Sequence, residues 1–318
     1  MNQLITITSR NLKQYLRDKG AIFFSLLSMF IIIVLMFFFL GDTTANGIRD
    51  LLAQFPGRDA ARDNDNAKLL ILAWTCAGMV CINAVTVSVA SLSYMIKDRE
   101  NGKLNAIYTA PVSRLTIAAG YVLAAWISSM IICAATLLIS ELYCISQGMA
   151  PFSLLSHLKL LGIIAANSFT YATLMYLVAA LVRSSGAWGG LGTVIGTLVG
   201  FLGGIYFPIG ELSDGIAAII KCTPVIHGSA LFRQEMTAAV MADTFAGLPV
   251  EVADEVNRVM GMKVTSATMI LPLLSMEIRA ISALGSSGIC RSSSALTAAA
   301  SSMLSVTSTA LAFLSCSA

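Results

Sequence analysis

The stretch LLILAWTCAGMVCINAVTVSVASLSYMI, at residues 69–96, contains no charged side chain. A helix that crosses a bilayer needs about 20 mostly apolar residues, so this run is long enough to cross the bilayer and to tilt within it. The residues that follow, KDRENGK at 97–103, begin with alternating bases and acids. This sharp boundary predicts a membrane helix that ends in a charged loop.

The composition of the whole chain agrees with this interpretation. Of the 318 residues, 57% are hydrophobic and 12% are charged, whereas soluble domains carry about 25% charged residues. The net charge is +3, and the basic residues lie in short clusters beside apolar runs instead of forming one basic face, which argues against a nucleic-acid partner. We expect an all-α integral membrane protein surrounded by the lipid bilayer.

Five apolar runs have the length of membrane spans; they are 21–40, 69–96, 117–145, 158–182 and 187–207. The first run exceeds the roughly 7–15 apolar residues of a signal peptide, and no small-residue cleavage site follows it, so we interpret it as a retained anchor. For a sixth span, 264–290 contains Glu277 and Arg279, and 295–313 is rich in Ser, Thr and Ala; we favour the second. The chain 1–318 is then one transmembrane domain of about six helices.

The positions of Lys and Arg predict the orientation, because cytoplasmic loops are enriched in these residues. Residues 1–20 and the loop 97–116 are rich in them, and Arg183 lies in the short turn after the fourth span. In 41–68 and 208–263, by contrast, acids outnumber bases. We therefore expect a multi-pass protein of the cell membrane whose N-terminus is cytoplasmic.

The first 20 residues have the pattern of an amphipathic helix. Leu4, Ile5, Leu12, Tyr15 and Leu16 fall near one side of such a helix, and the basic residues fall elsewhere around it. This pattern suits a helix that lies on the inner membrane surface before the first span. An ordinary charged flank with no fixed orientation is the alternative.

The inner loop 97–114 predicts a short helix at about 102–108. This helix must stop before Pro111, because the residue ahead of a proline disfavours the helical conformation, and Ser113 can cap the next helix. A short charged helix between two long spans is suited to docking a cytosolic partner. A simple solvated turn would have the same composition, and both interpretations stay open at this point.

The stretch 208–262 predicts an outer hairpin and loop. Pro208 breaks the fifth span, Asp214 can cap a short apolar helix, and Pro224 separates that helix from a second one at about 227–236. A re-entrant or interfacial hairpin accounts for the pattern, followed by a small exposed helix at 250–260. The Ser- and Ala-rich tail from about residue 282 is consistent with a final span, a disordered segment or an upstream frame error.

The sequence carries no motif of covalent chemistry. It lacks the P-loop, HExxH and GxSxG patterns and any cluster of His, Asp and Glu, so we expect no catalytic, cofactor or metal site and no enzyme activity of its own. Cys76, Cys81 and Cys133 lie inside apolar runs without CxxC spacing and are expected to be small buried hydrophobes. Both histidines are expected to be structural or solvent-facing.

Three further features are candidates for a role in transport. Glu141 is an ionisable residue inside a predicted span and is therefore a candidate for gating or for the substrate path, although it lies close enough to the outer end to reach the interface. Pro208, at the start of the outer hairpin, and Pro224, between its two helices, are candidates for the same path. The small-residue spacing in the fifth span predicts close helix packing within the subunit or across a dimer; it involves Gly192, Gly196, Gly200 and Gly204.

The sequence MIKDRENGKL at 95–104, followed by YTAPVSR at 108–114, resembles the charged inner loop of the permease subunits of type-2 ABC exporters. The amphipathic N-terminus and the outer hairpin reinforce this resemblance, which covers about residues 1–275. The Ser- and Ala-rich C-terminus departs from the pattern.

The resemblance implies that the loop is a coupling helix in a groove of a P-loop ATPase subunit. The coupling residues would be Lys97, Asp98, Arg99, Glu100, Gly102, Lys103 and Leu104. It also implies a second permease subunit, as a homodimer or heterodimer, with ATP and Mg²⁺ bound by the ATPase partner and no cofactor on this chain. Rival functions are an ion-driven secondary transporter, which would show more intramembrane charge, and a membrane scaffold without transport.

Overall fold

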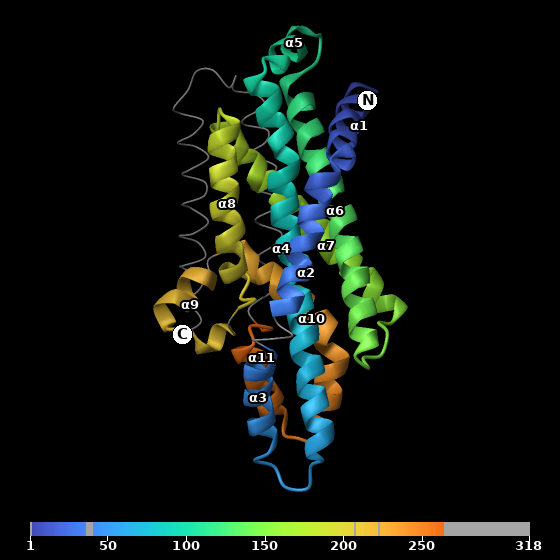
Figure 1. Cartoon of the computed structure of the whole chain (residues 1–318), viewed down its shortest axis with the longest axis vertical. Helices are drawn as coiled ribbons and strands as arrows, with labels where there is room; N and C mark the ends of the chain where they lie inside the picture. The colour runs from blue at the N-terminus through green and yellow to red at the C-terminus, as the bar shows by residue number, and fades with distance from the viewer. Residues whose placement is uncertain (1, 36–40, 207, 222, 264–318) are drawn as a thin grey trace.

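The computed structural model describes residues 2–35, 41–206, 208–221 and 223–263. In these residues every regular element is a helix, and the helices form an elongated bundle (Figure 1). The prediction of an all-α protein is therefore confirmed.

The central element is α4, Ala60–Glu100, which packs against α6 (Arg114–Ser146), α7 (Leu154–Leu181), α8 (Ser185–Leu202) and α10 (Pro224–Thr244). Its 41 residues correspond to roughly 60 Å of helix at about 1.5 Å per residue, or twice the thickness of a bilayer core. The apolar run 69–96 lies inside α4. The helix begins before this run, because Asp59 caps it by accepting a hydrogen bond from the Ala61 amide. The α4 helix therefore extends beyond the membrane at its N-terminal end.

Within the described residues, α4, α6, α7 and α8 are each long and apolar enough to cross a membrane, and the bent pair α9 (Asp214–Lys221) and α10 would make a fifth span. The first predicted span begins in α2, Lys19–Leu35; its remainder, 36–40, lies outside the described residues, as do 264–290 and 295–313. The total of about six remains a prediction. The fifth predicted span ended at 207, whereas α8 ends at Leu202, where glycines begin a turn.

The N-terminal helix α1, Asn2–Arg17, runs alongside α6 and does not lie across the end of the bundle (Figure 1). Ile7 fits against Gly120 of α6 so closely that a Cβ there would lie 2.5 Å from Ile7 Cγ2. Tyr15 is buried, whereas Ile5, which the sequence pattern places on the same side, is 59% exposed. The buried side of α1 is thus rotated away from part of the expected apolar side, because the contact is with a neighbouring helix.

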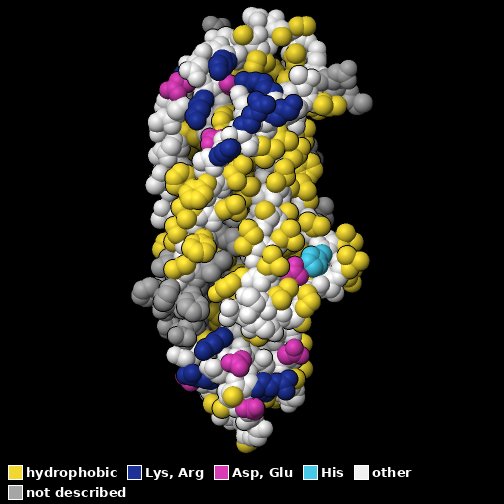
Figure 2. Space-filling view, turned by 45° about the vertical axis from the view of Figure 1, so that its right-hand side comes forward, with side chains coloured by type: hydrophobic (Ala, Val, Ile, Leu, Met, Phe, Trp, Pro, Cys, Tyr) yellow, Lys and Arg dark blue, Asp and Glu magenta, His cyan; other side chains and the backbone are white. Residues whose placement is uncertain are grey.

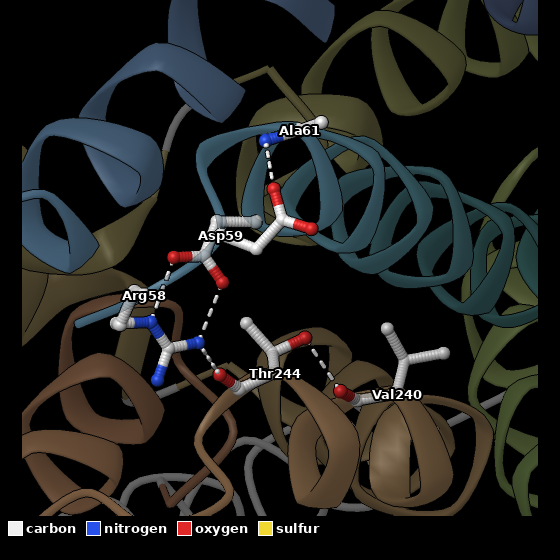
Figure 3. Close-up of polar contacts among 6 residues, drawn as sticks. Arg58, Asp59, Ala61, Val240 and Thr244 are labelled. Atoms are coloured by element: carbon white, nitrogen blue, oxygen red, sulfur yellow. Dashed lines mark hydrogen bonds and ion pairs between the residues drawn. The ribbon is translucent and has the colours of Figure 1, made fainter.

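The opposite end of the bundle is a small helical region formed by α3 (Gly41–Leu52), the start of α4, the end of α10 and α11 (Val250–Val259). Arg58 links these elements. Its Nη2 lies 2.6 Å from Asp63 Oδ1, and it donates to the carbonyl oxygen of Thr244 at 2.7 Å (Figure 3). The α3 helix lies in the acid-rich segment 41–68, to which we assigned no helix. The helical spacing of its buried residues Ala45, Ile48 and Leu52 is the signal for it.

The hairpin of α9 and α10 enters the bundle. The Cys81 thiol, near the middle of the predicted span 69–96, donates to the carbonyl of Val225 at 3.5 Å, so α10 begins at membrane depth. Pro224 occupies the first turn of α10, where its missing N–H costs nothing. The second helix is longer than the predicted 227–236, because it continues to Thr244 in the small helical region beside α3 and α11.

Candidate coupling site

The charged loop lies at one end of the molecule, beyond α4 and α6 (Figure 1). Gly102 has φ = +70° and joins α4 to the short helix α5, Lys103–Thr109; a left-handed residue is readily supplied by glycine. The Ser113 hydroxyl accepts a hydrogen bond from the Thr116 amide at 3.1 Å and caps α6. The predicted short helix and the predicted cap are both confirmed.

The α5 helix has one buried and one exposed side. Leu104 is buried and Ile107 packs against the core, which fixes the helix on the bundle. Lys103, Asn105 and Ala106 are exposed. The exposed side is therefore available to another molecule, while the buried side holds α5 against the bundle.

Asp98, the first acid of the loop, is buried and does not face the exterior. One of its carboxylate oxygens lies 2.8 Å from Arg10 Nη1 of α1 and accepts a hydrogen bond from the hydroxyl of Tyr121 at 2.8 Å. The interaction with Asp98 raises the pKa of Arg10 above its ordinary value. Asp98 thus joins the end of α4 to both α1 and α6.

Arg99 points to the C-terminal end of α7. Its Nη1 donates to the carbonyl oxygens of Ala179, Ala180 and Val182, the last at 2.6 Å. The final carbonyls of a helix have no partner within it and carry partial negative charge. Arg99 therefore satisfies the end of α7 and links it to α4.

Glu100 points to the beginning of α8. Its Oε2 accepts hydrogen bonds from the backbone amide of Ser185, at 3.2 Å, and from the Ser185 hydroxyl. A carboxylate is stabilised at a helix N-terminus by the free N–H groups and by the positive end of the dipole. Asp98, Arg99 and Glu100, which we name the inner clasp, thus hold α1 with α6, α7 and α8 respectively.

A family model for ABC-2 type transporters matches residues 2–237. This chain belongs to the ABC-2 type transporter family. No curated protein and no solved structure matches it. The helical fold and the family together make the chain a multi-pass membrane protein and a permease of ABC exporter type.

Sequence reasoning missed the partners of the inner clasp in this permease. Arg10 was considered only as a marker of orientation, and Tyr121 and Ser185 were not singled out. Arg10 lies next to the buried Asn11 on α1, on a side of the helix that the sequence pattern did not predict to be buried, so the sequence held no signal for it. Tyr121 and Ser185 become visible only when distant helices are brought together.

The N-terminal part of the first span is anchored to α4 nearby. Asp18 accepts hydrogen bonds from the Ala21 amide at 2.9 Å and from the hydroxyl of Tyr94 at 2.7 Å, and these bonds lower the pKa of Asp18. Lys97 lies over the ring of Tyr94 at 5.2 Å. The remaining predicted coupling residue with a charge, Lys103, is exposed on α5.

Glu141 of the permease lies near the C-terminal end of α6, away from α5, and is buried. Its Oε1 accepts a hydrogen bond from the Phe152 amide at 3.0 Å, and its Oε2 lies 2.8 Å from His157 Nε2. Both oxygens thus hold the turn between α6 and α7. Pro208 precedes the short 3-10 helix Ile209–Glu211, and Pro224 lies in the first turn of α10; neither proline takes part in the hydrogen bonds of Glu141.

Arg233, the most deeply buried charge among the described residues, was also missed. Its side chain is 0% exposed, it lies 4.1 Å above the ring of Trp74, and its Nη2 donates to the carbonyls of Gly203 and Gly204 at 2.9 Å. The Trp74 indole donates in turn to the Met260 carbonyl at 2.8 Å. Arg233 therefore connects α4, α8 and α10. We name Arg233, Trp74, Gly203 and Gly204 the outer junction.

Proposed function

We propose that this permease subunit is driven by a separate P-loop ATPase subunit that docks on α5, and that the inner clasp transmits the ATPase movement to the spans. The observation that carries this proposal is the arrangement of three consecutive residues. Asp98, Arg99 and Glu100 bind three different parts of the bundle directly behind an exposed helix. A displacement of α5 would thereby act on α1, α6, α7 and α8 together.

In this mechanism the permease performs no covalent chemistry. ATP and Mg²⁺ are bound by the ATPase partner, and nucleotide-driven closure of two ATPase subunits supplies the work. The exposed Lys103 and Asn105 of α5 would contact the ATPase, while Leu104 on the buried side keeps α5 fixed to the permease. Alternating access of the spans then exports the substrate.

We place α5 and the N-terminus in the cytoplasm. Figure 2 has a dense group of Lys and Arg side chains at the α5 end, a broad apolar belt in the middle, and mixed acids and bases at the opposite end. Basic residues are enriched on the cytoplasmic side of membrane proteins. The small region of α3, α10 and α11 would accordingly lie outside the cell membrane.

A second permease subunit, identical or related, would complete the substrate path. The outward side of α8 supports this, because a Cβ at Gly186, Gly189, Gly190 or Gly196 would meet no atom within 4 Å. Small residues let the backbones of membrane helices approach closely. By contrast, Gly192 and Gly200 face Val89 and Tyr206 within the same subunit. The predicted row of small residues would therefore serve both packing within the subunit and packing across a dimer.

The test is affinity purification of the tagged full-length protein from mild detergent, with identification of co-purified proteins and an ATPase assay. Lys103→Glu should lower the recovery of a P-loop ATPase at least several-fold. Lys68→Glu, which makes the same charge change on the exposed outer part of α4, should leave recovery unchanged. A stable wild-type protein that recovers no ATPase would refute the proposal and favour an ion-driven transporter.

A further inference from the structure

A groove of about 400 Å³ lies between α7 and α10, away from the inner clasp. Its size falls within the range of small-molecule sites, about 300–1,000 Å³. Its lining is mostly apolar and small, and it comprises Gly162, Ile163, Ala166, Gly228 and Leu231, with Asn167 at one end and Lys159, Gln234 and Glu235 at the other. From Lys159 to Ala166 the groove follows α7 for roughly 10 Å, at about 1.5 Å per residue.

Gly162 leaves the groove open, and Gly228 lets the Asn167 side chain pack closely against α10. A Cβ at Gly162 would meet no atom within 4 Å, so this position opens into free space, whereas a Cβ at Gly228 would lie 2.4 Å from Asn167 Oδ1. The Asn167 amide contacts Cys81 of α4, which places its polar atoms toward the bundle. The middle of the groove is thus suited to an alkyl chain.

The outer part of α7 beside the groove faces the lipid. Leu154, Leu155 and Leu158 are 88%, 63% and 69% exposed, and exposed leucines on a membrane helix are in contact with acyl chains. Leu161, next to Gly162, is also exposed. A lipid can therefore reach the groove sideways from the bilayer.

The mouth of the groove carries one charge of each sign. Lys159 Nζ lies 3.2 Å from both carboxylate oxygens of Glu235. The Lys159 side chain is 53% exposed, and that of Glu235 is 17% exposed, so the ammonium group retains open directions for a further acceptor. Such a pair is complementary to a headgroup that itself has a negative and a positive end.

We infer that this groove binds a phospholipid with a phosphoethanolamine headgroup. An acyl chain lies along Gly162, Ala166 and Leu231, a phosphate oxygen accepts hydrogen bonds from Lys159, and the lipid ammonium donates to Glu235. A choline headgroup has no N–H to donate, and a glycerol headgroup has no cation, so both satisfy Glu235 less well. The site needs insertion in the membrane but neither ATP nor the ATPase partner.

The test is native mass spectrometry of the purified full-length permease with dioleoyl phosphatidylethanolamine, phosphatidylcholine or phosphatidylglycerol added at equal concentration. The wild type should bind the ethanolamine lipid at least fivefold more than the other two. Gly162→Leu fills the groove and should abolish this difference, while Gly162→Ala, which adds one methyl group, should retain it. Equal binding of the three lipids by the wild type, or unchanged binding by Gly162→Leu, overturns the inference.

The headgroup contacts are tested separately. Glu235→Gln should remove the preference for ethanolamine over choline and leave binding of both lipids measurable, whereas Lys159→Gln should weaken binding of both. A preference that persists in Glu235→Gln contradicts the assignment of the ammonium contact. Because ATPase recovery is not part of this assay, its result is independent of the proposed function.

Discussion

Arg99 and Arg233 make the same kind of contact near opposite ends of α8. Arg99 donates to the last carbonyls of α7 beside α5, and Arg233 donates to the carbonyls that follow α8 at the outer junction. In each case a guanidinium satisfies acceptors that a helix end leaves without partners. The two arginines differ in their surroundings.

Arg99 is half-buried, so water can replace its contacts when they open. Arg233 is fully buried over Trp74, and its Nε and Nη1 have no hydrogen-bond partner within the described residues. A buried charge that loses its partners is costly because no water replaces them. We therefore expect the inner contacts to open and close during coupling and the outer junction to stay closed.

The largest expected effect comes from Arg233→Gln. This change removes the positive charge that lies over the Trp74 ring and leaves the buried carbonyls of Gly203 and Gly204 without their donor. It should lower the free energy of unfolding by roughly 3–4 kcal/mol, measured by denaturant titration in detergent. Arg99→Gln should cost only about 1 kcal/mol. The matched control is Arg258→Gln on exposed α11, which should leave the transition unchanged; equal losses for Arg233→Gln and Arg99→Gln would remove the distinction between the two ends.

The next largest effect concerns the contacts of Asp98 in the inner clasp. Asp98→Ala leaves the hydroxyl of Tyr121 and the guanidinium of Arg10 without their acceptor, and it should destabilise the protein by roughly 2–3 kcal/mol. Arg10→Ala combined with Asp98→Ala should show a coupling energy of about 1 kcal/mol or more in a double-mutant cycle. Lys13→Ala, on the exposed side of the same helix, is the control; additive effects would mean that the ion pair does not join α1 to α4.

The stability of the small helical region of α3, α10 and α11 should have its own pH dependence. Hydrogen bonds from Arg58 hold the pKa of Asp63 below its ordinary value of 3.8. A lowered pKa stabilises the folded state fully at pH values well above 3.8, and this stabilisation is lost as the pH falls through the lowered pKa. Between neutral pH and pH 3, wild type should lose up to roughly 1 kcal/mol more than Arg58→Gln, as followed by thermal unfolding. Parallel pH profiles for the two proteins would exclude this contribution.

The smallest expected effect concerns Gly102, which joins α4 to α5. Gly102→Ala forces a side chain into a left-handed conformation and should cost about 1 kcal/mol, with a larger proportional loss of ATPase coupling because α5 is displaced. Gly215→Ala, at an open position in α9 without positive φ, is the control and should be neutral or slightly stabilising. Equal behaviour of the two variants in both assays would show that the conformation of Gly102 is not required.

The sequence by itself determined the features that depend on neighbouring residues. The apolar runs predicted the positions of α4, α6, α7 and α8, since a long uncharged segment needs either a bilayer or a core around it. The short α5 helix and its end before Pro111 followed from local backbone preferences, and so did the cap at Ser113. These rules act within a few residues, so no knowledge of the fold was required.

The tertiary structure alone decided which charges meet. The pattern placed Asp98, Arg99 and Glu100 in one loop, but their partners are dozens of residues away along the chain, and no local rule selects among distant helix ends. The same holds for Arg233, whose burial depends on α4 and α8 as well as on its own helix. Hydropathy reports what a segment needs from its surroundings, whereas only packing determines which segments supply it.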